Sequence, residues 1–129
     1  MTEKLSNDRN EKVLENLKAI KSAVAEHEKA NDVKIMAVTK TVPADIVNTA
    51  IDEGGIRLLG ENRVQELLDK YDDYHKDGCE IHFIGHLQTN KVKYIVDKVD
   101  MKESVDSEKL ADVIERECEK IGKVMPVLV

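Results

Sequence analysis

Residues 33–43, VKIMAVTKTVP, place a nearly continuous apolar segment directly before a lysine and a proline. An apolar run of this kind is typical of a strand in a parallel sheet, where both faces are covered. Pro43 suits the first turn of a helix. We therefore expect a strand at 33–39, a helix after Pro43, and Lys40 at the carboxyl end of the strand. Desolvation at such a place lowers the pKa of an amine, and an unprotonated amine can form a Schiff base with an aldehyde.

Strands and helices alternate on both sides of this segment. Apolar residues at helical spacing predict a leading helix over 7–29, which the Asn31-Asp32 pair ends. Helices are also expected after Pro43 and around 92–99. Another helix is expected to begin at an Asn62 N-cap, with Gln65 reaching back to it, and the last to run from a Ser107 cap to Gly122. Further strands are expected at 56–60, 81–85, 101–105 and 124–129, and Lys102-Glu103 makes the one at 101–105 unusually polar.

The order α(βα)4β predicts parallel strands joined by right-handed crossovers, an α/β fold. Two architectures compete, a (β/α)8 TIM barrel cut short and a small doubly wound sheet. The final residues, MPVLV at 125–129, form an apolar strand with nothing after it to cover it. We therefore expect residues 1–129 to be the N-terminal part of a single barrel domain that is truncated at its C-terminal side. Residues 1–30 would be the leading helix, and 33–129 the barrel units.

Composition narrows the classes of function. The chain has 129 residues, a net charge of -6 and 3% aromatic residues. Nucleic-acid modules need a basic face or aromatic platforms, so we expect no nucleic-acid partner. No apolar run approaches the roughly 20 residues of a membrane span, so we expect no membrane partner. Cys79 and Cys118 are far apart and read as free thiols in a reducing cytoplasm.

Three segments contain side chains that could carry chemistry. Lys40 is either a solvated lysine at a strand end or a reactive amine, and its position alone leaves both open. Residues 60–66, GENRVQE, read as a helix start at Asn62, although the carboxyl end of a strand is also where barrel ligands bind. Cys79, His82 and His86 could be imagined as zinc ligands, but core histidines fit better because the three lie along one extended strand.

Together these segments resemble one family. Residues 37–43 (AVTKTVP), 60–66 (GENRVQE) and 82–91 (HFIGHLQTNK) match the YggS/PROSC family, the pyridoxal phosphate homeostasis proteins, in order and spacing. Residues 104–107 (SVDS) also fit. The resemblance covers almost the whole chain.

The resemblance implies a barrel like the N-terminal domain of alanine racemase. It implies pyridoxal 5'-phosphate (PLP) held as a Schiff base on Lys40, with Asn62 beside the cofactor. Family members look like binding and homeostasis proteins, so no enzymatic turnover is expected, and PLP-dependent apoenzymes are candidate recipients of the cofactor. The alternative is a PLP-dependent enzyme of the alanine racemase-like class acting on amino acids.

The resemblance also implies a departure at the C-terminal side. Family members continue through later strands, whose serine- and glycine-rich loops grip the phosphate. We therefore expect this 129-residue chain to retain the lysine, to lack the phosphate loops, and to bind PLP more weakly than a full-length relative.

Overall fold

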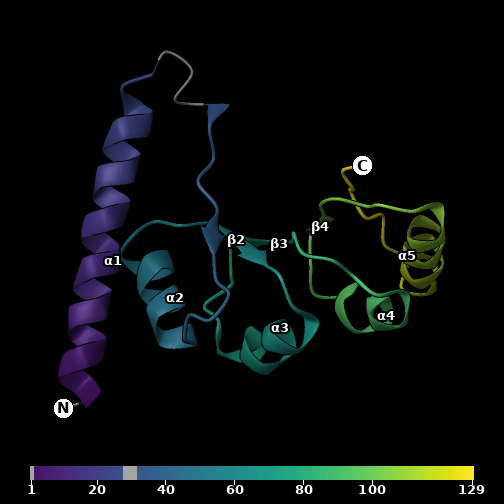
Figure 1. Ribbon diagram of the computed structural model, residues 1–129, viewed down its shortest axis with the longest axis horizontal. Coiled ribbons are helices and arrows are strands. Elements are labelled where there is room, and N and C mark those ends of the chain that lie inside the picture. Colours follow the sequence, from purple (N-terminus) through teal and green to yellow (C-terminus); the bar gives the residue numbers. More distant parts are fainter. Residues whose placement is uncertain (1, 28–31) are drawn as a thin grey trace.

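A computed structural model describes residues 2–27 and 32–129 of the chain, with the side chains of 2–7 left out. Helices and strands alternate as expected from the sequence (Figure 1). The helices are α1 (Thr2–Ala25), α2 (Ala44–Asp52), α3 (Val64–Lys70), α4 (Val92–Ile95) and α5 (Glu108–Lys120). The strands are β1 (Ala37–Val38), β2 (Leu58–Glu61), β3 (Glu80–Phe83) and β4 (Met101–Lys102). A short 3-10 turn at Tyr71–Asp73 follows α3, and another at Thr89–Lys91 precedes α4.

The strands form one parallel sheet in the order β1-β2-β3-β4. The final segment adds to its far edge, because Lys102 pairs with Val127 in parallel and Leu128 donates its N–H to the Lys102 carbonyl. The expected fifth strand is therefore present as a short bridge. Parallel strands in sequence order, each followed by a helix, are the arrangement of a partial barrel, and the α/β barrel prediction is confirmed.

Helices cover one face of this sheet. Figure 1 shows α2, α3 and α4 below the strands, with α1 outside α2 and α5 beside α4. Side chains that point toward these helices are fully buried, such as Leu59 and Phe83 at 0% exposure. On the other face Val38 is 46% exposed, and no described helix covers it. The sheet therefore has one core face and one open face.

The polar pair in β4 proves compatible with a strand. Lys102 is 1% exposed and packs on the helix side, in register with Phe83. Its amine donates to the carbonyl oxygens of Gly85 (2.9 Å), Ser104 (3.5 Å) and Glu103. A buried lysine is tolerated where carbonyl groups replace its hydration, and the sequence pattern alone cannot show them.

Several predicted boundaries are wrong in detail. Only residues 37–38 of the expected strand at 33–39 pair as a strand, because the segment before them has no described strand beside it, and Val33 is exposed. The leading helix, predicted over 7–29, begins at Thr2 and already ends at Ala25, while residues 28–31 lie outside the described residues. Ser107 does cap α5, since its Oγ accepts the Leu110 N–H at 3.1 Å.

Candidate cofactor site

Lys40 and Asn62 lie at the carboxyl edge of the sheet. The register pairs Val38 with Gly60, and the Thr39 N–H then donates to the Gly60 carbonyl at 3.1 Å. Lys40 follows the last paired residue of β1 by two positions, and Asn62 follows Gly60 of β2 by two positions. The two residues predicted from sequence therefore follow neighbouring parallel strands at the same edge of the sheet.

The amine of Lys40 is exposed. Within residues 2–27 and 32–129, no hydrogen bond or ion pair to it is formed. Of the two readings that the sequence left open, the structure shows the exposed lysine, because Lys40 follows the buried Thr39 at the rim of the open face. Accessibility, rather than desolvation, is what the fold provides here.

The backbone around Lys40 is tightly held. Thr39 is 1% exposed, and its hydroxyl donates to Oε1 of Glu61 at 2.6 Å. The Val42 N–H donates to the Thr39 carbonyl at 3.1 Å and closes a turn. Within the turn Thr41 has a φ of 61°, a left-handed conformation that is uncommon for a residue with a Cβ. The exposed Lys40 therefore stands on a hydrogen-bonded turn.

Two residues of α3 hold the same turn, and neither was singled out from the sequence. The Lys70 amine donates to the carbonyl of Val42 at 2.6 Å and to that of Thr39 at 3.3 Å. A Glu66 carboxylate oxygen accepts the Thr41 N–H at 2.6 Å. Their spacing of four residues was the available signal, since it predicts a side-chain pair on one helix face.

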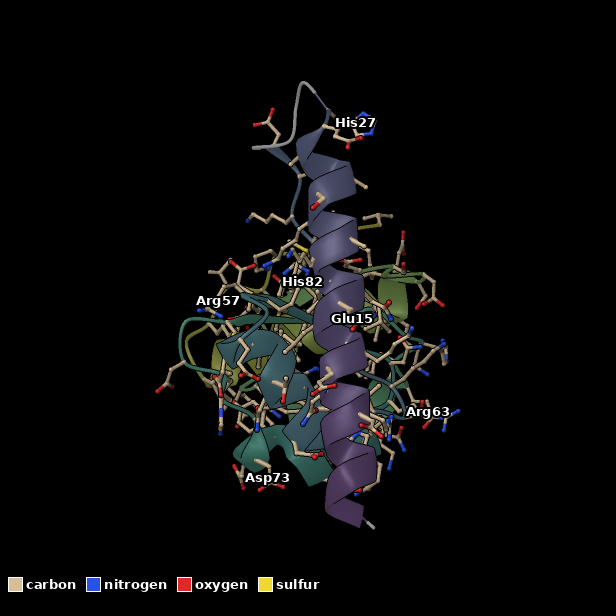
Figure 2. The ribbon with its side chains drawn as sticks, turned by 90° about the vertical axis from the view of Figure 1, so that its left-hand side faces the viewer. Glu15, His27, Arg57, Arg63, Asp73 and His82 are labelled. Atoms are coloured by element: carbon tan, nitrogen blue, oxygen red, sulfur yellow. The ribbon has the colours of Figure 1, made fainter. Side chains whose placement is uncertain are left out.

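Asn62 does not cap a helix. The N-cap of α3 is Arg63, without a side-chain cap bond, and the Gln65 amide donates forward to Asp69 at 2.8 Å instead of reaching back. Figure 2 shows Arg57 and Arg63, which flank β2, projecting from opposite sides of the molecule. The helix cap expected at Asn62 is therefore wrong, and Asn62 is a half-buried residue that follows β2 at the carboxyl edge of the sheet.

The ends of β2 and β3 come unusually close. A Cβ added to Gly85 would lie 2.2 Å from the carbonyl oxygen of Asn62, closer than real Cβ atoms approach. The Ile84 N–H donates to the Glu61 carbonyl at 2.8 Å and holds the two strand ends together. Gly85 is therefore required for the close packing beside Asn62.

An acid-base pair lies near this edge, but on the covered face. Glu61 is 0% exposed, and its Oε1 accepts the Tyr74 hydroxyl at 2.6 Å. Within the described residues Oε2 of the same carboxylate has no partner. Burial, followed by the hydrogen bond to Glu61, raises the pKa of Tyr74. The sheet separates both groups from the open face.

The residues once considered as zinc ligands have other contacts. The His82 ring lies 2.9 Å from a Glu103 oxygen and 3.1 Å from a Glu80 oxygen. The core-histidine reading holds for the buried His82 and is wrong for His86, which is exposed and lies 3.7 Å from Asp106. The half-buried Cys79 thiol donates to the backbone carbonyls of Ile56 and His75, at 3.9 Å each, and packs against the hydrophobic core.

Comparison with known proteins identifies the family. The family model of the alanine racemase N-terminal domain matches residues 10–129. The chain belongs to this family. Among curated relatives, the pyridoxal phosphate homeostasis protein of Aquifex aeolicus is 42% identical over 99 residues, which cover 77% of this chain and 43% of the relative. The Mus musculus protein of the same name is 44% identical over 102 residues, with 74% and 37% covered.

Solved structures agree with the family assignment. PipY of Synechococcus elongatus, solved with PLP bound, superimposes with a TM-score of 0.77 at 32% identity, covering 89% of this chain and 52% of PipY. The form of PipY without PLP superimposes with a TM-score of 0.75. The chain thus spans about half of PipY, and less than half of the two curated relatives above. In the described part of this racemase-domain chain, none of the helices has the length and apolar character that crossing a bilayer requires.

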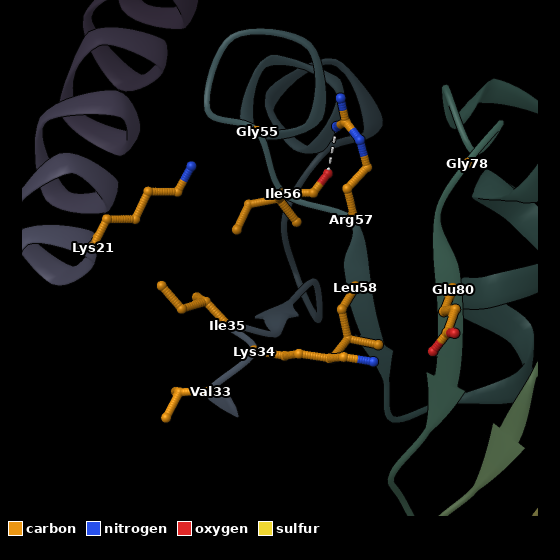
Figure 3. Close-up of a pocket in the computed structure, with 10 residues that line it drawn as sticks. All are labelled: Lys21, Val33, Lys34, Ile35, Gly55, Ile56, Arg57, Leu58, Gly78 and Glu80. Atoms are coloured by element: carbon orange, nitrogen blue, oxygen red, sulfur yellow. Dashed lines mark hydrogen bonds between the residues drawn. The ribbon is translucent and has the colours of Figure 1, made fainter. Parts of the chain in front are cut away.

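A separate hollow of about 360 Å³ lies at the opposite edge of the sheet in this family member. Figure 3 shows its lining, with Lys21 reaching in from α1 and Lys34 extending beneath Leu58. The Arg57 guanidinium donates to the carbonyls of Ile51 and Ile56 at 2.8 Å each. Because the hollow lies at the amino edge and Lys40 at the carboxyl edge, it is no part of the candidate site.

The residues at the carboxyl edge of this racemase-domain chain fit an aldehyde cofactor. The accessible Lys40 amine can reach an incoming carbonyl carbon, and the adjacent Asn62 carboxamide can donate and accept hydrogen bonds.

Proposed function

We propose that this chain binds PLP as a Schiff base on Lys40, with Asn62 beside the cofactor, and that it serves PLP homeostasis. The observation that carries this proposal is the exposed Lys40 amine on a fixed turn at the carboxyl edge. Barrels place their ligand-binding residues at that edge. The names of the curated relatives and the PLP bound to PipY support the same assignment.

The proposed attachment is a simple condensation. The bound group supplies an aldehyde, Lys40 supplies the amine, and a C=N bond forms as the aldehyde oxygen leaves in one water molecule. The anchored backbone on both sides of Lys40 keeps the amine at the edge, so that little motion is needed to reach the carbonyl carbon.

Borohydride trapping tests the assignment. Incubation with PLP, reduction of the C=N bond to a stable amine and peptide mass mapping should place the adduct on Lys40. Lys40→Arg should abolish this adduct, whereas Lys34→Arg, which alters an exposed lysine at the other edge, should leave it intact. Since reduction accumulates even weakly formed adducts, unmodified Lys40 at millimolar PLP would refute the proposal.

We propose binding without turnover, because the buried Glu61–Tyr74 pair faces the helix layer. Glu61 and Tyr74 are buried on the covered face, where neither touches a ligand at the open face. Incubation of the PLP-loaded protein with single enantiomers of amino acids should leave their chiral composition unchanged. Racemisation that depends on Lys40 would instead support an enzyme of the alanine racemase-like class.

The proposal also covers the surrounding barrel, the recipients of the cofactor and the cellular location of the protein. We propose that the described units form one part of a single PLP-binding barrel, and that PLP-dependent apoenzymes receive the cofactor. Cys79 and Cys118 are free thiols, and burial raises the pKa of each. Protonated free thiols fit a reducing compartment, which supports a cytoplasmic location.

A further inference from the structure

The side chains of Glu66 and Lys70 form an ion pair that differs from the others on the surface. The Lys70 amine lies 2.5 Å from a Glu66 carboxylate oxygen, and the two side chains are only 15–18% exposed. The comparable pair on α5, Glu117 with Lys120, has an oxygen–nitrogen distance of 2.9 Å, but its lysine is 62% exposed. Both side chains of the α3 pair are therefore held against the protein, whereas the lysine of the α5 pair stands in solvent.

The element that it touches is the turn carrying Lys40. An ammonium group has three N–H donors, and here they go to the carbonyls of Thr39 and Val42 and to Glu66. The Glu66 carboxylate also accepts the Thr41 N–H at 2.6 Å. One anchored backbone group precedes Lys40 and two follow it, so the pair spans the reactive residue.

The anchored turn contains an unfavourable conformation. Thr41 has a φ of 61°, and such backbone persists only where its surroundings enforce it. The carboxylate that accepts the Thr41 N–H is the group in position to enforce it. The hydrogen bond from Lys70, which outweighs the opposing effect of burial, lowers the pKa of Glu66, and Thr41 adds to that lowering. Glu66 is consequently ionised at neutral pH.

We propose that Glu66 and Lys70 are positioning residues for Lys40, acting as a clamp that sets the direction in which its amine leaves the sheet edge. The clamp rests on the proposed function of Lys40 as the PLP lysine. Glu66 and Lys70 would not themselves form the covalent bond, since every donor of the Lys70 amine is in use while the Lys40 amine is free of contacts among the described residues.

The test compares the rate at which Lys40 is modified with the protection of the Thr41 amide. Wild type, Lys70→Met, Glu66→Gln and Lys70→Arg are incubated with PLP, reduced with borohydride at timed intervals and analysed by peptide mass mapping. Glu117→Gln and Lys120→Met provide matched controls, because they remove the corresponding groups of an ion pair on α5, away from the turn that carries Lys40. Amide hydrogen exchange of Thr41 is measured on the same proteins without PLP, and circular dichroism establishes that each is folded.

We expect Lys70→Met and Glu66→Gln to modify Lys40 about tenfold more slowly, because misplacing a reacting group by a fraction of an ångström costs rates of this order. The adduct should remain on Lys40, and the Thr41 amide should exchange faster. Lys70→Arg keeps the charge and its donors, so it should recover part of the rate. The α5 variants should match wild type.

Three outcomes separate this clamp from the proposed function. Faster Thr41 exchange with an unchanged rate at Lys40 would make the pair purely structural and overturn the positioning role. Unchanged Thr41 exchange in Lys70→Met and Glu66→Gln would overturn the clamp itself. No adduct on Lys40 in the wild type would overturn the function of Lys40, and the positioning role with it. If Lys70→Met does not fold, Glu66→Gln and Lys70→Arg decide between these outcomes.

Discussion

The two faces of the sheet differ in how far their side chains are exposed to solvent. The covered face contains the fully buried Leu59 and Phe83 and a buried carboxylate, Glu61, whereas the open face leaves Val38 46% exposed. Successive residues of a strand point to opposite faces, so Thr39 is sealed into the protein while Lys40 stands free. The difference shows how one short segment supplies both a core anchor and an accessible amine.

The largest expected effect comes from the centre of the covered face. Phe83→Ala removes a side chain with 0% exposure and should destabilise the fold by about 3–5 kcal/mol. Val38→Ala, on the open face, should cost under about 1 kcal/mol, because most large losses arise from buried positions. Urea unfolding followed by circular dichroism measures both. Equal losses would mean that the open face is covered in solution.

The next largest loss of stability is expected at Gly85, which follows β3, and Gly60 in β2 serves for comparison. At Gly85 an added Cβ meets the backbone of Asn62, which cannot move aside, so Gly85→Ala should cost about 1–3 kcal/mol. At Gly60 an added Cβ meets chiefly the Met36 sulfur at 2.5 Å, the end of a flexible side chain. Gly60→Ala should therefore be the milder change. Thermal unfolding ranks the pair, and the reverse order would contradict the close approach at Asn62.

Loss of the hydrogen bond from Tyr74 to Glu61 on the covered face should have an intermediate effect on folding stability. Tyr74→Phe removes the hydroxyl that donates to the Glu61 carboxylate, and hydrogen bonds to charged groups contribute about 1.5–3 kcal/mol. Tyr94 is 45% exposed, so Tyr94→Phe is the matched control and should be nearly neutral. Chemical denaturation compares the two variants. A neutral Tyr74→Phe would show that the carboxylate does not depend on this donor.

The smallest expected effect is a pH dependence of folding stability that arises from Glu66, beside the turn that carries Lys40. The pKa of Glu66 is lowered from its ordinary value of 4.5, chiefly by the hydrogen bond from Lys70. The folded state then binds fewer protons than the unfolded state, so the contribution is fully present above about pH 4.5 and is lost as the pH falls through the lower folded pKa. Glu66→Gln should flatten the acid side of the stability profile. An identical slope in wild type and variant would exclude this contribution.

Much of the architecture could be read from local pattern. The helix expected after Pro43 is present as α2, and Ser107 predicted the start of α5. The Asn62 prediction as a helix cap failed, because capping depends on the direction in which the chain leaves β2. The polar side chain of Lys102 made the strand at 101–105 look unusual, although β4 is present there. Its carbonyl partners, Gly85 and Ser104, lie in loops that only folding brings beside it.

The sequence by itself determined the alternation of strands and helices, the place of Lys40 after a strand, and the family to which the chain belongs. These depend on short-range spacing and on motifs that stay contiguous along the chain. Only the tertiary structure decided that Lys40 is exposed rather than buried, and that Glu66 and Lys70 hold its turn. Those contacts join residues 25–31 positions apart. Hydrogen bonds of this range arise from the packing of α3 against the sheet edge, which no local pattern encodes.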